Sequence, residues 1–142
     1  MPIRNFPFSI TSPADAIARP WIPIKIINPH SNKTVRFIGL IDTGADECAI
    51  PALFAPILGH DLDKGAPKTI GSAGGPTQGY SHTTKIEIYD FSDKLCYTIN
   101  ETPIDFMPNL NVVLLGVKQF LDQFELHINY PVKTFSIKYP AK

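Results

Sequence analysis

Apolar and polar residues alternate along much of this chain, which is the pattern of β-strands with one buried face. The first clear case is the segment 22–27, where Ile22, Ile24 and Ile26 fall on one face. Pro23 restricts this strand to a sheet edge or to the strand's start. Similar segments, separated by turn-forming residues, follow at 84–89, 95–99, 125–129 and 134–139. The pattern predicts a mainly β domain built from hairpins.

One apolar run departs from this alternation and ends abruptly. It extends from Phe37 to Ile41 and is followed by Asp42-Thr43-Gly44-Ala45. A short apolar run without helical spacing predicts a strand that is buried on both faces. A carboxylate at the end of such a strand is costly unless it is hydrogen-bonded or takes part in chemistry. Gly44 lets another backbone or a ligand come close, and the Thr43 hydroxyl can both donate and accept. These residues predict a rigid turn that presents Asp42.

A glycine-rich segment covers residues 69–80. Its glycines are Gly71, Gly74, Gly75 and Gly79. Taken alone, the segment indicates a loop at the tip of a hairpin. A phosphate-binding loop is the other general interpretation, but the glycine order matches neither the dinucleotide fingerprint nor the Walker pattern with its lysine.

A third segment, residues 112–124, changes its period in the middle. An apolar strand reaches Gly116, and a helical pattern then places Val117, Phe120, Leu121 and Phe124 on one face. Alone, this segment predicts an ordinary strand and helix in a core.

Length and charge limit the class of protein. The chain has 142 residues, enough for one domain. Residues 1–20 hold four prolines and little periodicity, which predicts an irregular N-terminal arm before a single domain at 21–142. Lys plus Arg and Asp plus Glu both number 13, so the formal net charge is zero. With no basic patch and no apolar run of membrane-spanning length, we expect neither nucleic acid nor a membrane as a partner.

The cysteines and histidines indicate no special chemistry. The chain has only two cysteines, Cys48 and Cys96. Its N-terminus lacks the apolar core of a signal peptide. We therefore expect reduced, buried thiols in a cytoplasmic protein, with a disulfide between them as the less favoured alternative. The four histidines have no paired metal-ligand spacing, so we expect no metal and no cofactor.

The segment Leu40-Ile41-Asp42-Thr43-Gly44-Ala45-Asp46 resembles the active-site turn of the retropepsin-like aspartic proteases. The glycine-rich segment resembles their flap, and the strand before Gly116 resembles the apolar-apolar-Gly motif before their C-terminal helix. The resemblance, closest to cellular and bacterial members, implies a closed β-barrel of hairpins with a Gly-rich flap and one short C-terminal helix. Proteolysis by this family needs two aspartates, and only one Asp-Thr-Gly is present, so it also implies a homodimer that cuts polypeptide substrates.

The same resemblance assigns roles residue by residue. Asp42 would be catalytic, activating water between the two copies, and Thr43 and Gly44 would support the turn. The residues that would bind substrate are Gly44, Ala45, Asp46, Gly74 and Gly75.

One departure from the family pattern concerns the residue after Gly116. Many retroviral members carry an Arg or Asp there, and an Arg can pair with the acidic residue that corresponds to Asp46. Here Val117 and Lys118 follow, so Lys118 is the candidate partner. The alternatives to a protease are a dimeric peptide-binding module on the same fold and an enzyme of another kind that uses the glycine-rich loop.

Overall fold

The computed structural model describes residues 3–11, 17–71 and 75–140. It is mainly β, with ten strands and three short helical segments in these ranges. The strands are β1 (Ile3–Pro7), β2 (Trp21–Ile27), β3 (Thr34–Ile41), β4 (Ala49–Pro51), β5 (Ala66–Ile70), β6 (Thr77–Tyr89), β7 (Leu95–Met107), β8 (Val113–Leu115), β9 (Glu125–Asn129) and β10 (Thr134–Lys138). The helical segments are α1 (Phe54–Ile57) and the 3-10 turns η1 (Leu62–Lys64) and η2 (Leu121–Gln123).

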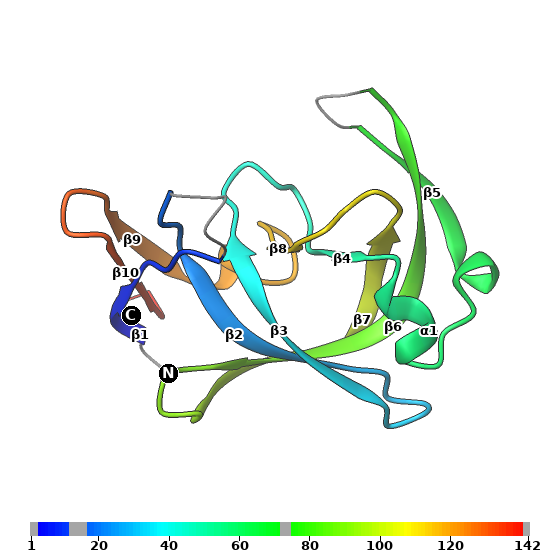
Figure 1. Ribbon diagram of the computed structural model, residues 1–142, viewed down its shortest axis with the longest axis horizontal. Helices are drawn as coiled ribbons and strands as arrows, with labels where there is room; N and C mark the ends of the chain where they lie inside the picture. The colour runs from blue at the N-terminus through cyan, green and yellow to red at the C-terminus, as the bar shows by residue number, and fades with distance from the viewer. Residues whose placement is uncertain (1–2, 12–16, 72–74, 141–142) are drawn as a thin grey trace.

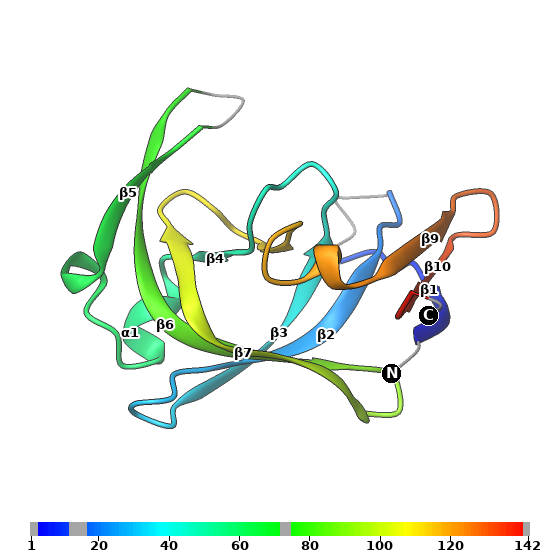
Figure 2. The ribbon, with the colours of Figure 1, turned by 180° about the vertical axis from the view of Figure 1, so that it is seen from behind.

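Six strands form a closed barrel. They follow the order β2-β3-β8-β4-β7-β6, and β6 pairs again with β2 to close the ring. The closing pairs include Ile24 with Ile88 and Ile26 with Ile86, and all four side chains are fully buried. Figures 1 and 2 show β2, β3, β6 and β7 crossing at the base of the molecule. The predicted mainly β barrel is thus the observed fold, since the alternating isoleucines supply its interior.

A smaller sheet, β1-β10-β9, lies beside the barrel (Figure 1). Its strand β1 lies in the segment predicted to be irregular, and that prediction was wrong for Ile3–Pro7. Ile3 and Phe6 are both buried, three residues apart, because a bulge with Asn5 at positive φ separates their pairings with β10. The bulge replaces the two-residue period by which strands are predicted.

The long strands β6 and β7 extend beyond the segments that alternation predicts. The predicted segments 84–89 and 95–99 are parts of β6 and β7, and β6 extends from the barrel into a hairpin with β5. This hairpin rises from the barrel in Figure 1. The glycine-rich segment is therefore a hairpin connection, as predicted. Gly74 lies outside the described residues, and Gly75 has a positive φ of 107°.

The predicted C-terminal helix takes the form of the 3-10 turn η2. Gln119 has a positive φ of 75°, so the amides of Leu121 and Asp122 donate to carbonyls five residues back instead of four. Of the apolar residues at helical spacing, Phe120 and Leu121 are buried and Phe124 is half-buried, but Val117 is exposed. No helix of the described residues is long and apolar enough to cross a membrane.

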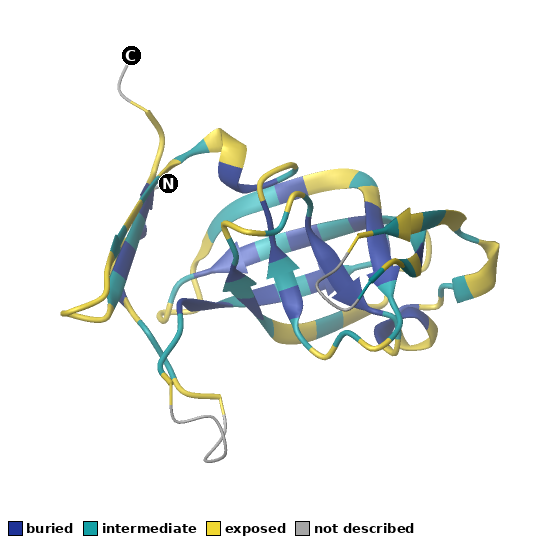
Figure 3. Cartoon of the chain, turned by 90° about the horizontal axis from the view of Figure 1, so that it is seen from above, coloured by how far each residue is buried: buried dark blue, intermediate teal, exposed yellow. Residues whose placement is uncertain are grey.

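The buried positions run along the barrel strands, as Figure 3 shows. One continuous apolar core joins the barrel to the small sheet through residues such as Phe6, Phe120 and Phe135. Single exposed apolar side chains remain outside this core, Leu53 and Ile57 among them.

A pair of histidine rings lies where the hairpin leaves the barrel. His60 and His82 have ring centroids 4.5 Å apart, and both rings contact Phe106 edge-on. The side-chain Nδ2 of Asn28, which can only donate, lies 3.4 Å from His60 Nδ1, so this ring nitrogen accepts and carries no proton. Burial, followed by the nearby His82, lowers the pKa of His60 from 6.5 to about 4.

Replacing His60 tests this pair. The unfolded chain takes up the His60 proton near pH 6.5, and the folded chain only near pH 4, so stability falls as the pH drops through this window. In His60→Phe, which keeps an aromatic ring, we expect a smaller loss of unfolding free energy between these two pH values. Urea denaturation at both pH values measures it. His127→Phe, at an exposed position of β9, is the control and should behave as wild type. An unchanged pH dependence in His60→Phe would contradict the assignment.

Candidate functional site

Asp42 begins a tight turn directly after β3. Its amide donates to Leu115 O on β8 at 3.2 Å, and its carbonyl accepts from the Ala45 amide at 3.2 Å. Its Oδ1 accepts from the Gly44 amide at 2.9 Å. The parallel pairing of β3 with β8 sets where the strand ends, and these bonds fix the direction of the half-buried carboxylate. The predicted rigid turn is therefore present.

Residues 42–48, between β3 and β4, form a loop that we call the Asp42 loop. The segment after β8 packs against it and supports it. The amides of Val117 and Lys118 donate to the carbonyls of Ala45 and Asp46 at 2.9 and 2.8 Å. A Cβ on Gly116 would lie 2.4 Å from the Glu47 carbonyl oxygen and 2.7 Å from that of Ala45. Only glycine fits this close approach of two backbones.

Gln119 adds a side-chain support that the sequence did not indicate. Its Oε1 accepts from the Cys48 amide at 2.9 Å, and its Nε2 donates to Pro103 O at 3.0 Å. The side chain thus connects the end of the Asp42 loop to β7. No periodicity or motif identifies a glutamine in this role, because it depends on the positive φ at that residue.

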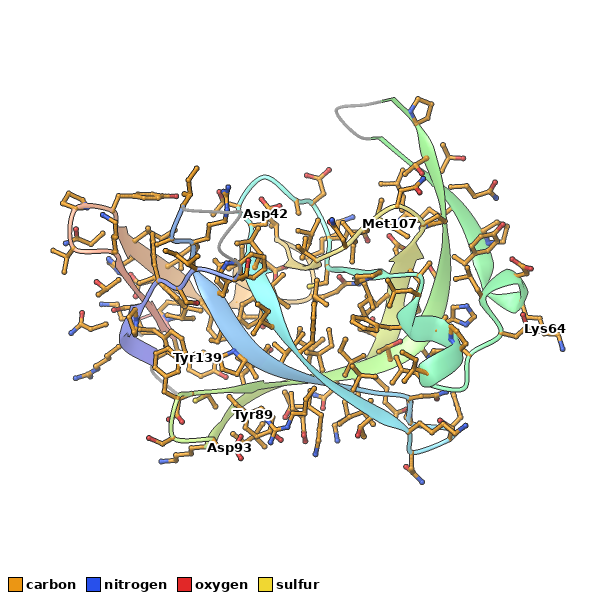
Figure 4. The ribbon with its side chains drawn as sticks, in the orientation of Figure 1. Asp42, Lys64, Tyr89, Asp93, Met107 and Tyr139 are labelled. Carbon is orange, nitrogen blue, oxygen red and sulfur yellow. The ribbon has the colours of Figure 1, made fainter. Side chains whose placement is uncertain are left out.

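A cleft of about 530 Å³ opens beside Asp42. Figure 4 labels Asp42 at the end of β3 and Met107 at the end of β7, and both residues line the cleft. Its charged lining residues are Asp42, Asp46, Glu47, Lys68 and Asp105. Its apolar lining includes Ala49, Ile70, Met107, Leu110 and Leu114. The hairpin β5–β6 supplies one wall and the Asp42 loop another, and apolar and charged side chains both line the cleft.

The structure brings together most of the residues that the sequence singled out. Gly44, Ala45 and Asp46 line the cleft with Asp42. Thr43 is exposed and, with Asp42, lines a smaller hollow of about 200 Å³ beside Ile17 and Tyr130. Gly75 is not among the residues of the cleft, and Gly74 lies outside the described ranges.

Lys118 does not neutralise Asp46. Both side chains are exposed, and no ion pair joins them in the described part of the chain. The contact between these residues is the main-chain hydrogen bond from the Lys118 amide. Solvent can hydrate an exposed carboxylate, so Asp46 needs no cation for stability.

Three charged side chains meet in the cleft wall, and the sequence did not indicate them. Lys68 Nζ on β5 contacts Glu47 Oε2 in the Asp42 loop and Asp105 Oδ2 on β7, the second at 3.3 Å. The hydrogen bond with Glu47 is the main reason that the pKa of Lys68 lies above its usual value. The contact could not be predicted from the sequence, because nothing in the residues around Lys68 or Asp105 indicates that the two side chains are close in the fold.

The cysteines and histidines add no chemistry to this cleft. Burial raises the pKa of the Cys48 thiol to about 11, so it stays protonated at neutral pH and is a poor nucleophile. Both Cys48 and Cys96 are free thiols. Within the described ranges, no group of three or more His, Cys, Asp or Glu residues could hold a metal ion.

Comparison with solved structures identifies the fold. The chain is similar to a retropepsin-like aspartic protease from Rickettsia conorii, with a TM-score of 0.58 and 21% sequence identity over 84% of this chain and 81% of that chain. The EIAV protease in complex with the inhibitor HBY-793 matches with a TM-score of 0.49 and 21% identity, over 80% and 93% of the two chains. No family model and no curated protein matches the chain. The first similarity shows that the chain has the retropepsin-like fold.

The contact beneath the Asp42 loop predicts the effect of adding one methyl group. Gly116→Ala must push the loop and the β8 segment apart, so we expect a loss of roughly 1–3 kcal/mol of unfolding free energy, the usual cost of overpacking. Gly71→Ala is the control, because its new Cβ would meet no atom within 4 Å. Chemical denaturation of both variants measures the difference. Equal stability of the two would contradict the close contact.

Proposed function

We propose that this protein is an aspartic endopeptidase whose active form is a homodimer. The observation that carries the proposal is the Asp42 carboxylate, held by the Gly44 amide at the side of a cleft of about 530 Å³ on a retropepsin-like fold. The similar protein from Rickettsia conorii is described as an aspartic protease. A polypeptide is therefore the substrate class that we assign to the cleft.

The proposed chemistry needs two Asp42 carboxylates, one from each chain. Two carboxylates held close together cannot both stay charged at low cost, so they share one proton, as is general for aspartic proteases. The ionised carboxylate takes a proton from a water between them, and this water attacks the peptide carbonyl carbon. The protonated carboxylate hydrogen-bonds to the developing oxyanion. One of the two Asp42 carboxyl groups, both protonated at this stage, then gives its proton to the departing nitrogen as the carbon–nitrogen bond breaks.

The other residues have supporting roles in this proposal. Thr43, which is exposed at the turn, would bond to its own copy across the two-fold axis. Gly44, Ala45 and Asp46 would contact the substrate in the cleft, where their side chains or backbone are accessible. The hairpin that carries Gly74 and Gly75 would act as a flap over the bound peptide.

The face beside Asp42 is our candidate for the dimer interface. Ile17, Tyr130 and Val132 are exposed apolar side chains, and the first two line the hollow that Asp42 and Thr43 share. A second copy placed there would bring its own Asp42 turn to the first. The cytoplasmic location that the free cysteines favour also stays a proposal.

Asp42→Asn tests the catalytic assignment. The amide cannot take a proton from water, so cleavage of a diverse peptide library between about pH 4 and 8 should fall at least about 100-fold. Product formation is measured by mass spectrometry. Asp63→Asn, an exposed position in η1, removes a carboxylate far from the turn and should cut as wild type does. Tight peptide binding by wild type without any cleavage would favour a peptide-binding module on the same fold.

The dependence of rate on concentration tests the homodimer. If one Asp42 comes from each chain, doubling a dilute chain concentration should raise the cleavage rate about fourfold, because the active species forms from two chains. Initial rates over a dilution series, with sedimentation of the same samples, measure this. A strictly linear dependence with a monomer in solution would contradict the proposal.

A further inference from the structure

Lys68 connects two walls of the cleft that are far apart in the sequence. Its Nζ contacts Glu47 Oε2, which belongs to the loop that begins at Asp42, and lies 3.3 Å from Asp105 Oδ2 on β7. Lys68 itself belongs to β5 and pairs with Gly79 of the hairpin. One ammonium group therefore joins the hairpin both to the Asp42 loop and to the barrel.

The carboxylate of Asp105 explains why this ammonium group is held in place. Asp105 is buried, and its Oδ1 accepts from the Ser81 hydroxyl at 2.7 Å. A buried charge needs an opposite charge as well as hydrogen bonds, and Lys68 supplies it. The Lys68 side chain is itself 41% exposed, whereas that of Asp105 is 9% exposed, so the buried partner fixes the more exposed one.

Glu47 transmits this contact to the turn. It directly precedes Cys48, whose amide is held by Gln119, and its own carbonyl packs against Gly116. The loop side of the contact is therefore fixed by backbone and side-chain bonds. The hairpin side is less restrained, since β5 is the edge strand of its sheet and pairs with β6 alone.

We propose that Lys68 is a positioning residue that holds the hairpin β5–β6 at a fixed distance from the Asp42 loop, so that the cleft is formed before a substrate enters. The ion pairs with Glu47 and Asp105 hold the fixed wall and the edge hairpin together. A preformed cleft lowers the cost of binding, because less of the chain must be ordered when the peptide arrives. The consequence for substrate rests on the proposed peptidase function, whereas the restraint on the hairpin does not.

Hydrogen exchange of the hairpin amides without substrate tests the restraint. In Lys68→Met, we expect the amides of residues 66, 68–71 and 77–80 to exchange about 3–10-fold faster, because local opening becomes more frequent. Lys64→Met is the matched control. Lys64 lies just before β5, is 83% exposed, and lies at the outer end of the molecule away from the cleft in Figure 4. Lys64→Met should leave the exchange rates of the hairpin amides unchanged. Lys68→Arg, which keeps the positive charge, should exchange nearly as slowly as wild type.

A double-mutant cycle separates the ion pair from a general effect of losing a lysine. Glu47→Gln should speed hairpin exchange in wild type but add little in the Lys68→Met background, because the partner is already gone. Additive effects of the two substitutions, or unchanged exchange in Lys68→Met, would overturn the proposal.

Peptide kinetics then separate positioning from a purely structural role. Lys68→Met should raise KM about 3–10-fold while kcat changes less than about twofold, since the reacting groups remain but the cleft is less often formed. A fall in kcat at unchanged KM, or no kinetic change despite faster exchange, would contradict the positioning role. If wild type cuts no peptide, the proposed function fails, while the exchange measurements still decide whether Lys68 restrains the hairpin.

Discussion

The Asp42 loop is held by a contact between two backbones that leaves no room for a side chain. Gly116 lies directly under the carbonyls of Ala45 and Glu47, and the next two amides donate to the loop. Such bonds have little freedom, because the donors and acceptors belong to the main chain and the strand β8 behind them is buried in the barrel. The orientation of Asp42, the position of Glu47 and the shape of the cleft all depend on this contact.

The two walls of the cleft are supported by different kinds of interaction. Main-chain hydrogen bonds fix the loop wall, and their strength changes little with salt. The hairpin wall is an edge strand joined to the rest by the charges of Lys68, Glu47 and Asp105. Ion pairs that are partly exposed become weaker when the ionic strength rises or when the distance between the charged atoms increases. The position of the loop wall therefore depends on main-chain bonds, whereas the position of the hairpin wall depends on charges that salt can screen.

Several features could be predicted because each is encoded in a short stretch of residues. Alternating isoleucines in β2 identified a strand with one buried face, and the run ending at Asp42 identified a strand followed by a fixed turn. The expectation that this second strand is buried on both faces was wrong, because β3 is exposed or half-buried from Thr34 to Ile38. The predictions failed where a single residue with positive φ changed the local period. The bulge at Asn5 removes the two-residue period, so the strand β1 was predicted to be an irregular arm. The positive φ of Gln119 limits an expected helix to a 3-10 turn. These positive φ values depend on tertiary contacts. Neither residue is a glycine, so the sequence does not indicate a positive φ at either position.

The sequence by itself determined the mainly β fold class and the turn that presents Asp42, since local period and residue chemistry are properties of neighbouring residues. Only the tertiary structure decided that Lys68, Glu47 and Asp105 meet, that Asp46 lacks an ion pair with Lys118, and that Thr43 faces a different hollow from Ala45. These facts depend on how β5, β7 and the Asp42 loop come together in space. Contacts between residues that are 20 or more positions apart in the chain cannot be predicted from local sequence, because the closed barrel sets the distances between them.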